Sequence, residues 1–281
     1  MIDIKELSFS YRHERLFSGL NLSLEPGGIC GLLGKNGAGK TTLLKLMAGL
    51  LFPKEGDISI MEKDPSKRPV DFLQDLFFLP EVFDLPPVTK KQYKMLYTPF
   101  YPGFSAELFD SLLEQFEITG NKKLSSFSYG QKKKFLIAFG LATNSCLMLL
   151  DEPTNGLDIP SKSQFRKAVA SCIDDDRTFI ISTHQARDLE SLIDPVIILD
   201  EGRIIFNQSN EEISNRLKIS YRSGPPVPEE ALFYEKTFEG YTVVMENHDH
   251  EDSRIDLETL FNTVINNSAR ISGIFQDGGE R

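Results

Sequence analysis

Short apolar runs separated by turn residues dominate the first third of the chain. Residues Leu20–Leu24 alternate between apolar and polar with a period of two, which is typical of a half-buried strand. The short apolar run Ile29–Leu33 fits a strand buried within a parallel sheet. A helix is predicted from Lys40 to Gly49, because its apolar residues recur on one face. Further strands are predicted at Ile2–Phe9, Asp57–Met61 and Leu76–Leu79.

The pattern changes from strands to helices between Phe83 and Ser128, where several prolines punctuate the sequence. Its spacing predicts helices over Lys90–Tyr97 and Ala106–Phe116, followed by a third over Ser128–Ala142. A helical insertion between parallel strands explains this change, and we place it at about residues 83–134. In the third helix, Lys132-Lys133-Lys134 is expected to form a solvated face.

Strands and helices alternate from Cys146 onward. The predicted strands are Leu147–Leu150, Phe179–Ser182 and Val196–Leu199, with Arg203–Phe206 as one more candidate. The predicted helices between them are Gln164–Ile173 and Gln185–Leu192. Alternation of this kind predicts an α/β fold, in which helices cover both faces of a parallel sheet.

The last quarter of the chain has a different organisation. The run Ser223-Gly224-Pro225-Pro226-Val227-Pro228 is typical of a linker. Beyond it, Tyr241–Met245 predicts a strand, and the apolar stripe from Leu257 to Ile265 predicts an amphipathic helix. We therefore expect a main domain of residues 1–217 and a small acidic α+β appendix of residues 218–281.

Composition narrows the class of protein. The 281 residues are 40% hydrophobic and 26% charged, which excludes a wholly disordered or collagen-like chain. The net charge of −10 disfavours a protein that coats nucleic acid. No apolar run approaches the roughly 20 residues of a membrane-spanning helix, so a membrane role requires a partner. Cys30, Cys146 and Cys172 are expected to be buried free thiols, as in a reducing compartment.

The run Gly34-Lys35-Asn36-Gly37-Ala38-Gly39-Lys40-Thr41-Thr42 matches the pattern of a phosphate-binding loop. Its glycines allow several backbone N–H groups to face one phosphate cluster, and the helix that follows adds the positive end of its dipole. The Lys40 ammonium can reach the β- and γ-phosphates, and the Thr41 hydroxyl can ligate Mg²⁺. The residues expected to bind the nucleotide are Gly34, Asn36, Gly37, Gly39, Lys40, Thr41 and Thr42.

A second motif, Leu147-Met148-Leu149-Leu150-Asp151-Glu152-Pro153, is an apolar strand that ends in two acids. Asp151 is suited to hold the Mg²⁺ shell, and Glu152 can orient and polarise the attacking water. Such an ending is common by itself. Downstream of a phosphate loop, it indicates the second half of a nucleotide site.

Four further segments define the kind of phosphate-loop protein, and they are Tyr11, Ser126-Phe127-Ser128-Tyr129-Gly130-Gln131, Asn155-Gly156-Leu157-Asp158 and His184. In this order the sequence resembles the ATP-binding-cassette (ABC) ATPase family, from Ile2 to about Arg216. The resemblance implies a phosphate-loop (RecA-like) parallel-sheet core with an N-terminal antiparallel β subdomain and an inserted helical subdomain. It also implies ATP and Mg²⁺ as cofactors.

The resemblance assigns a role to each of these segments. Tyr11 resembles the aromatic that stacks on adenine, although an ordinary strand aromatic is the alternative. Phe127–Gln131 resembles the signature that caps the γ-phosphate of ATP held by a second cassette, through Ser128, Gly130 and Gln131. Asp158 resembles the acid of the loop that communicates across the dimer. His184 resembles the switch histidine at the γ-phosphate, and it joins Glu152 and Lys40 as the expected catalytic residues.

Two positions depart from the family pattern. Tyr129 stands where the family usually has glycine, and it brings bulk to a surface that must meet a partner. Glu81 follows the predicted strand Leu76–Leu79, where the family usually has a glutamine that contacts Mg²⁺ and water. We expect the Glu81 carboxylate to join Thr41 and Asp151 around the metal, because Mg²⁺ prefers hard oxygen ligands. The alternative is that Glu81 points to solvent or pairs with a lysine.

The function that the resemblance implies is a transporter motor, in which two cassettes close on ATP, hydrolyse it and reopen. The expected partners are a second ABC cassette, with a homodimer favoured, and an integral membrane permease that contacts the helical insertion. No nucleic acid partner is expected. The implied location is the cytoplasmic face of the cell membrane, and a finer similarity points to bacterial ABC-2-type exporters.

The alternative function is that of a soluble ABC-type ATPase acting in nucleic-acid or ribosome-related work. DNA-repair relatives carry long coiled coils or zinc modules, and translation-factor relatives carry two phosphate loops. None of these patterns occurs in the sequence. A guanine-nucleotide switch would need an Asn-Lys-x-Asp segment, which the sequence also lacks.

Overall fold

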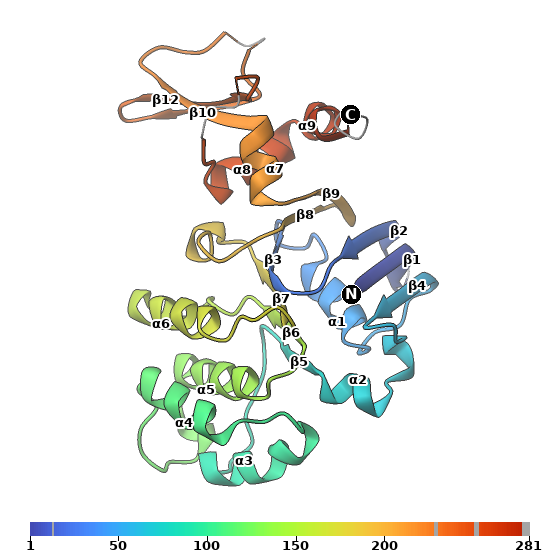
Figure 1. Ribbon diagram of the computed structural model, residues 1–281, viewed down its shortest axis with the longest axis vertical. Helices are drawn as coiled ribbons and strands as arrows, with labels where there is room; N and C mark the ends of the chain where they lie inside the picture. Colours follow the sequence, from blue (N-terminus) through green and yellow to red (C-terminus); the bar gives the residue numbers. More distant parts are fainter. Residues whose placement is uncertain (13, 228–229, 250–252, 277–281) are drawn as a thin grey trace.

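In the computed structural model of the protein, three β-sheets organise the described residues, which are 1–12, 14–227, 230–249 and 253–276 (Figure 1). The central sheet has the strand order β5 (Leu76–Leu79), β6 (Leu147–Asp151), β7 (Thr178–Thr183), β3 (Gly28–Leu33), β8 (Val196–Asp200) and β9 (Arg203–Gln208). Its strands are parallel except β9, which pairs antiparallel with β8. This arrangement confirms the predicted α/β class and parallel core.

The strands of the central sheet are buried on both faces because they are apolar at consecutive positions. In β6, Leu147 and Leu149 belong to the hydrophobic core on one side of the sheet, whereas Met148 and Leu150 belong to the core on the other. The strand β8 divides its side chains between the two cores in the same way. A continuous apolar run is therefore what a central parallel strand needs to fill two cores at once.

A smaller antiparallel sheet covers the first of these cores. Its strand order is β2 (Glu14–Leu24), β1 (Ile2–Tyr11) and β4 (Glu55–Ile60). The helix α1 (Lys40–Met47) buries Leu43, Leu44 and Met47 in the same core. Figure 1 shows this sheet and α1 beside the central sheet, which confirms the predicted N-terminal antiparallel subdomain.

Helices cover the second core. They are α3 (Lys90–Tyr97), α4 (Ala106–Gln115), α5 (Tyr129–Ala142) and α6 (Ile159–Ala170), with 3₁₀ turns at Thr98–Phe100 and Leu124–Ser126 as shorter pieces. The short helix α2 (Val70–Gln74), which follows a 3₁₀ turn at Pro65–Lys67, instead buries Phe72 in the first core. The ring of Phe139 on α5 lies 5.1 Å from that of Tyr93 and 5.8 Å from that of Phe109. Edge-to-face packing of these rings joins α3, α4 and α5 into one layer. The predicted helical insertion is therefore confirmed.

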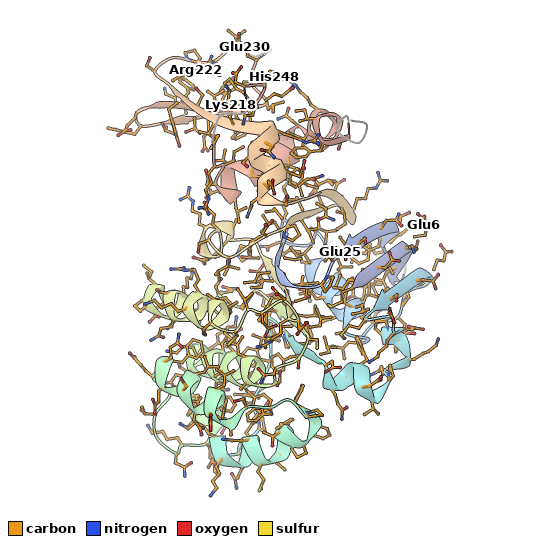
Figure 2. All side chains as sticks on the ribbon, viewed as in Figure 1. Glu6, Glu25, Lys218, Arg222, Glu230 and His248 are labelled. Atoms are coloured by element: carbon orange, nitrogen blue, oxygen red, sulfur yellow. The ribbon has the colours of Figure 1, made fainter. Side chains whose placement is uncertain are left out.

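The chain continues through α7 (Asn210–Arg216) into a third sheet, of order β10 (Leu217–Arg222), β12 (Gly240–Glu246) and β11 (Phe233–Thr237), and then α8 (Leu257–Asn266) and α9 (Ser268–Gln276). This α+β extension lies at the end of the molecule opposite α3 (Figure 1). Figure 2 labels Lys218, Arg222, Glu230 and His248 at its outer end. Its inner side continues the second core, because Val244 and Leu260 share a hydrophobic cluster with Val196 of β8.

The prediction of a linker at Ser223–Pro228 is wrong. Residues 223–227 begin the connection from β10 to β11, and these two strands belong to one sheet with β12 between them. Pro228 lies outside the described residues. Prolines and glycine mark a chain reversal here, and sequence composition alone does not distinguish such a loop from a connection between domains.

The predicted helix over Gln185–Leu192 is also wrong, because the structure has only a 3₁₀ turn at Ala186–Asp188. The carbonyl of Asp188 accepts a hydrogen bond from the guanidinium of Arg166, 3.1 Å away, instead of a helical N–H group. Leu189 is fully buried immediately after the turn. Tertiary contacts therefore override the helical spacing of the apolar residues.

The three cysteines are free, as predicted, with Cys30 and Cys172 buried and Cys146 only partly buried. Burial raises the pKa of the Cys30 thiol to about 12, so this side chain stays protonated and packs as a small apolar residue. None of the helices in the described part of the chain combines the length and the apolar character needed to span a bilayer.

A buried arginine closes the core at the edge of the sheet where β6 and β7 begin. Arg177 donates hydrogen bonds to the carbonyls of Leu141, Ser145 and Cys172, at distances of 3.1, 3.3 and 3.2 Å. The carbonyl of Leu141 lies in the last turn of α5, and those of Ser145 and Cys172 follow α5 and α6, where the chain would otherwise leave buried acceptors unpaired. The single guanidinium thus satisfies backbone groups from two helix ends.

We predict that Arg177→Met lowers the free energy of unfolding by about 2–4 kcal/mol, because it leaves several buried carbonyls without a hydrogen-bond donor. Lys167→Met is the matched control, since Lys167 lies exposed on α6 and its loss should change stability by no more than about 0.5 kcal/mol. Urea unfolding of both variants measures the difference. Equal stability of the two variants would show that the carbonyls find other donors.

Candidate functional site

The carboxyl edge of the central sheet brings together the motifs predicted in separate parts of the sequence. The strand β3 leads into the phosphate loop, β6 ends at Asp151, and β7 ends next to His184. In the sheet register, Asp151 lies beside Ser182, and Leu33 lies beside Thr183. Because parallel strands end at the same edge, three loops distant in sequence meet at one place.

The phosphate loop has the backbone shape that its glycines allow. Gly37 and Gly39 have φ angles of +84° and +112°, in the region that side chains disfavour. A Cβ atom on Gly39 would also lie 2.7 Å from the ring of Phe17. Gly39 is the N-cap of α1, so the first N–H groups of the helix have no intrahelical partner and are available to an anion.

The Asp151 carboxylate joins three elements at the floor of the site. It is fully buried, and it accepts hydrogen bonds from Thr41 Oγ1 at 2.7 Å and from Ser182 Oγ at 2.6 Å. The same Ser182 hydroxyl accepts a hydrogen bond from the N–H of Glu152 at 3.0 Å. The start of α1 and the ends of β6 and β7 are thereby held in register.

Glu152 has a left-handed backbone, with φ of +47°. Its Oε1 atom lies 2.8 Å from Nδ1 of His184 and 3.5 Å from Nζ of Lys40. The Lys40 ammonium also donates to the carbonyl of Gly34 at 2.8 Å. Three expected catalytic side chains, Glu152, His184 and Lys40, are therefore in mutual contact through one carboxylate.

A cavity of about 680 Å³ opens over these groups. Its volume falls within the 300–1,000 Å³ typical of small-ligand sites. Tyr11 lies at its edge, with a half-exposed ring whose hydroxyl is 3.2 Å from Thr42 Oγ1. The lining includes Tyr11, Asn36, Gly37, Gly39, Lys40, Thr41, Thr42, Glu81, Glu152, Asn155 and His184.

Glu81 lines the same cavity rather than pointing away from it. Its Oε1 atom accepts a hydrogen bond from Nδ2 of Asn155 at 3.1 Å. Its carbonyl accepts one from the Tyr129 hydroxyl at 2.5 Å. The two positions that depart from the family pattern, Glu81 and Tyr129, are therefore joined by a hydrogen bond.

The signature segment forms the start of α5. Ser128 is the N-cap, its Oγ accepts from the N–H of Gln131 at 3.3 Å, and the Gln131 side chain accepts from the N–H of Ser128 at 3.1 Å. Ser128 and Gln131 are exposed and, with Gly130, are not among the residues that line the cavity over Lys40. In a similar way, Asp158 caps α6 by accepting from the N–H of Ser161 at 2.9 Å.

The expectation that Lys132-Lys133-Lys134 forms a solvated face is wrong for its middle residue. Lys133 is fully buried, and its ammonium donates to the carbonyls of Glu152 and Asn155, each at 2.8 Å. Burial lowers the pKa of Lys133 to about 8. The available signal is its helical spacing, because Ile137, one turn later on the same face, is also buried.

The donor set fits a magnesium ion shared with phosphate. The Thr41 hydroxyl and the Asp151 carboxylate are hard oxygen donors only 2.7 Å apart. Within the described residues, no group of three or more His, Cys, Asp or Glu side chains could hold a metal alone. A cation here would therefore take part of its coordination from a bound polyphosphate, as Mg²⁺ commonly does. Together, the sheet, the loop and the acids define a phosphate-loop nucleotide-binding protein.

Comparison with known proteins gives the family. The sequence profile described as ABC transporter matches residues 17–155. The ABC transporter ATP-binding protein NatA of Bacillus subtilis (strain 168) is 31% identical over 201 residues, covering 69% of this chain and 82% of NatA. The Nod factor export ATP-binding protein I of Burkholderia orbicola (strain AU 1054) is 32% identical over 210 residues, covering 73% of this chain and 69% of that protein.

A solved structure of the ATP binding subunit of an ABC transporter is also similar, with a TM-score of 0.69 and 26% identity, over 76% of this chain and 91% of that one. The chain belongs to the family of ABC transporter ATP-binding proteins. It is an ATP-binding and ATP-hydrolysing transporter subunit, which confirms the main functional prediction. The alternative of nucleic-acid or ribosome-related work has no support among the relatives compared.

Proposed function

We propose that this chain is a Mg²⁺-dependent ATPase that works as a homodimer and drives a membrane permease, with Glu152 as the acid that activates water. The observation that supports this most directly is the contact of Glu152 with both His184 and Lys40 inside the phosphate-loop cavity.

Binding of ATP exchanges one set of Lys40 contacts for another. In the structure, the positive charge of the Lys40 ammonium is balanced by the Glu152 carboxylate and by the Gly34 carbonyl. Phosphate oxygens can take over this compensation, which releases the Glu152 carboxylate for catalysis. The free N–H groups at the start of α1 and the flexible glycines add to phosphate binding, and the Tyr11 ring offers its face to adenine.

In hydrolysis, a water oxygen attacks the γ-phosphorus, the bond to the β-phosphate oxygen breaks, and the water proton passes to Glu152. His184 donates through Nδ1 to Glu152 when that nitrogen carries the proton, which fixes the direction of the carboxylate. Thr41, Asp151 and Glu81 are the residues that would hold Mg²⁺. The bound ion would neutralise negative charge on the phosphate oxygens.

The signature, with Ser128 and Gln131 exposed and Gly130 partly exposed, is available to a second copy of the chain. A hydroxyl and an N–H group at the start of α5 are suited to the γ-phosphate, because a helix N-terminus favours an anion. We therefore infer two composite sites per dimer, each with Lys40 from one chain and Ser128 from the other.

The permease is proposed to dock on the helical insertion. Met95, Leu96 and Phe100 are exposed there despite being apolar, which is characteristic of an interaction surface. This would hold the chain at the cytoplasmic face of the membrane. We retain the division into a cassette of residues 1–217 and an extension of residues 218–281, and an export direction of the ABC-2 type, as proposals supported by the exporter relative described above.

Glu152→Gln is predicted to bind MgATP but to hydrolyse it at least about 100-fold more slowly, because the amide cannot accept the water proton. The variant should accumulate as an ATP-bound dimer, detectable by size-exclusion chromatography. Glu107→Gln, an exposed substitution on α4, is the control for the loss of one negative charge. Normal turnover by Glu152→Gln would assign proton acceptance to another group.

Ser128→Arg and Lys40→Ala are each predicted to be inactive alone but to complement each other when mixed. Every mixed dimer keeps one composite site intact, so a random mixture should regain up to about a quarter of the wild-type activity. Specific activity of the wild type should also rise with protein concentration. An ATPase rate that is strictly proportional to protein concentration, together with no complementation between the two variants, would contradict the composite site.

Glu81→Gln is predicted to raise the Mg²⁺ midpoint for ATP binding at least about threefold, because an amide oxygen holds Mg²⁺ less tightly than a carboxylate. Without Mg²⁺, the variant should bind ATP better than the wild type, since one repelling charge is gone. Asp84→Asn is the control, because Asp84 lies in the same loop but pairs with Lys132 of α5 and does not line the cavity. Superimposable Mg²⁺ titrations of binding and hydrolysis would exclude Glu81 from the metal site.

A further inference from the structure

The lysine at position 133 is the one buried cation in the signature helix, and no part of the proposed reaction uses it. Its side chain is fully buried one turn after the start of α5, whereas Lys132 and Lys134 on either side are partly exposed. No described carboxylate lies within ion-pair distance of its ammonium. The low pKa of Lys133, about 8, reflects the cost of keeping this charge away from water.

The partners of this ammonium are the two ends of one turn. Its hydrogen bonds reach the carbonyls of Glu152 and Asn155, each at 2.8 Å. The turn also closes on itself, because the N–H of Asn155 donates to the carbonyl of Glu152 at 3.2 Å. Lys133 therefore holds the backbone directly after β6, where the proposed catalytic acid lies.

The backbone at Glu152 needs such support. Its φ of +47° lies in the left-handed region, which a glutamate disfavours. Ser182 fixes the N–H group of Glu152 at 3.0 Å, and Lys133 fixes its carbonyl. With both sides of the residue held, the side chain leaves the backbone in the direction that meets His184 and Lys40.

The same contacts connect the acid to the signature. Tyr129, at the start of α5, donates to the carbonyl of Glu81, and Lys133 lies 5.1 Å from the centre of the Tyr129 ring. Asn155 completes a closed ring of contacts by donating to the Glu81 carboxylate. Movement of the first turn of α5 would therefore be transmitted through Lys133 to the Glu152 backbone.

We propose that Lys133 is a positioning residue for ATP hydrolysis, which holds Glu152 in its left-handed conformation and links its orientation to the signature helix. This inference rests on the proposed role of Glu152. It assigns Lys133 no contact with the nucleotide, because Lys133 does not line the cavity over the phosphate loop.

Lys133→Met tests the proposal, since it keeps an unbranched side chain and removes the donors. Lys134→Met, from the same triplet, is the matched control. Lys133→Gln is a second variant that keeps N–H donors, in case the first does not fold. The measurements are the Kd for MgATP, kcat, hydrogen exchange of the peptide containing Glu152–Asn155, and kcat of Lys133→Met combined with Glu152→Gln.

We expect Lys133→Met to bind MgATP within about threefold of the wild type but to lose about 10–100-fold in kcat, the scale of a misplaced catalytic group. Exchange at Glu152–Asn155 should become faster, and Lys134→Met should match the wild type. In the Glu152→Gln background, Lys133→Met should cause no further loss, because both changes disable the same group.

Other outcomes overturn the inference. An unchanged kcat in Lys133→Met, with a slow Glu152→Gln, would refute the role of Lys133 alone. An equal loss in the Glu152→Gln background would show that Lys133 acts elsewhere, and weaker MgATP binding would make it a binding residue. Normal turnover by Glu152→Gln would refute the proposed acid itself, and the role of Lys133 with it.

Discussion

The buried carboxylate of Asp151 is the constraint on which the arrangement of the site depends. It accepts hydrogen bonds from Thr41 on α1 and from Ser182 on β7, so one side chain of β6 fixes three elements at the carboxyl edge of the sheet. A buried carboxylate is costly unless such donors surround it, and here both oxygens are satisfied. The apolar strands provide the rigid support, because each is packed on both faces. Because α1, β6 and β7 are held in this way, Glu152 and His184, which follow β6 and β7, are brought into contact.

The two departures from the family pattern, Tyr129 and Glu81, are linked by a direct contact. Tyr129 replaces a glycine at the start of α5, and its hydroxyl is directed to the chain's own Glu81 loop. Its ring stacks on Phe83, with centroids 5.5 Å apart. The added bulk thus joins the signature helix to the loop after β5 within one chain. Asn155 and Lys133 extend this connection to the turn that follows Asp151.

The C-terminal extension is physically joined to the nucleotide-binding part. Its apolar residues continue the core on the helical side of the central sheet, and Glu258 of α8 pairs with Arg187 at 2.5 Å. Arg187 lies three residues after His184, in the 3₁₀ turn that follows β7. A cavity of about 560 Å³ separates α8 from Lys35 and Asn36 of the phosphate loop. The ion pair therefore joins the segment that follows His184 to α8 of the extension.

Elements with strong local patterns can be predicted from the amino-acid sequence. The helix over Lys90–Tyr97, the strand over Leu76–Leu79 and the phosphate loop were all predictable, because apolar spacing and glycine conformation act over a few residues. The helix expected after His184 failed, since Arg166 and the burial of Leu189 impose a tertiary alternative. The burial of Lys133 and its hydrogen bond to the carbonyl of Glu152 depend on tertiary packing, because the two residues are 19 apart in the sequence. Local patterns specify backbone conformation, whereas the partner of a buried charge depends on which distant segments the sheet brings together.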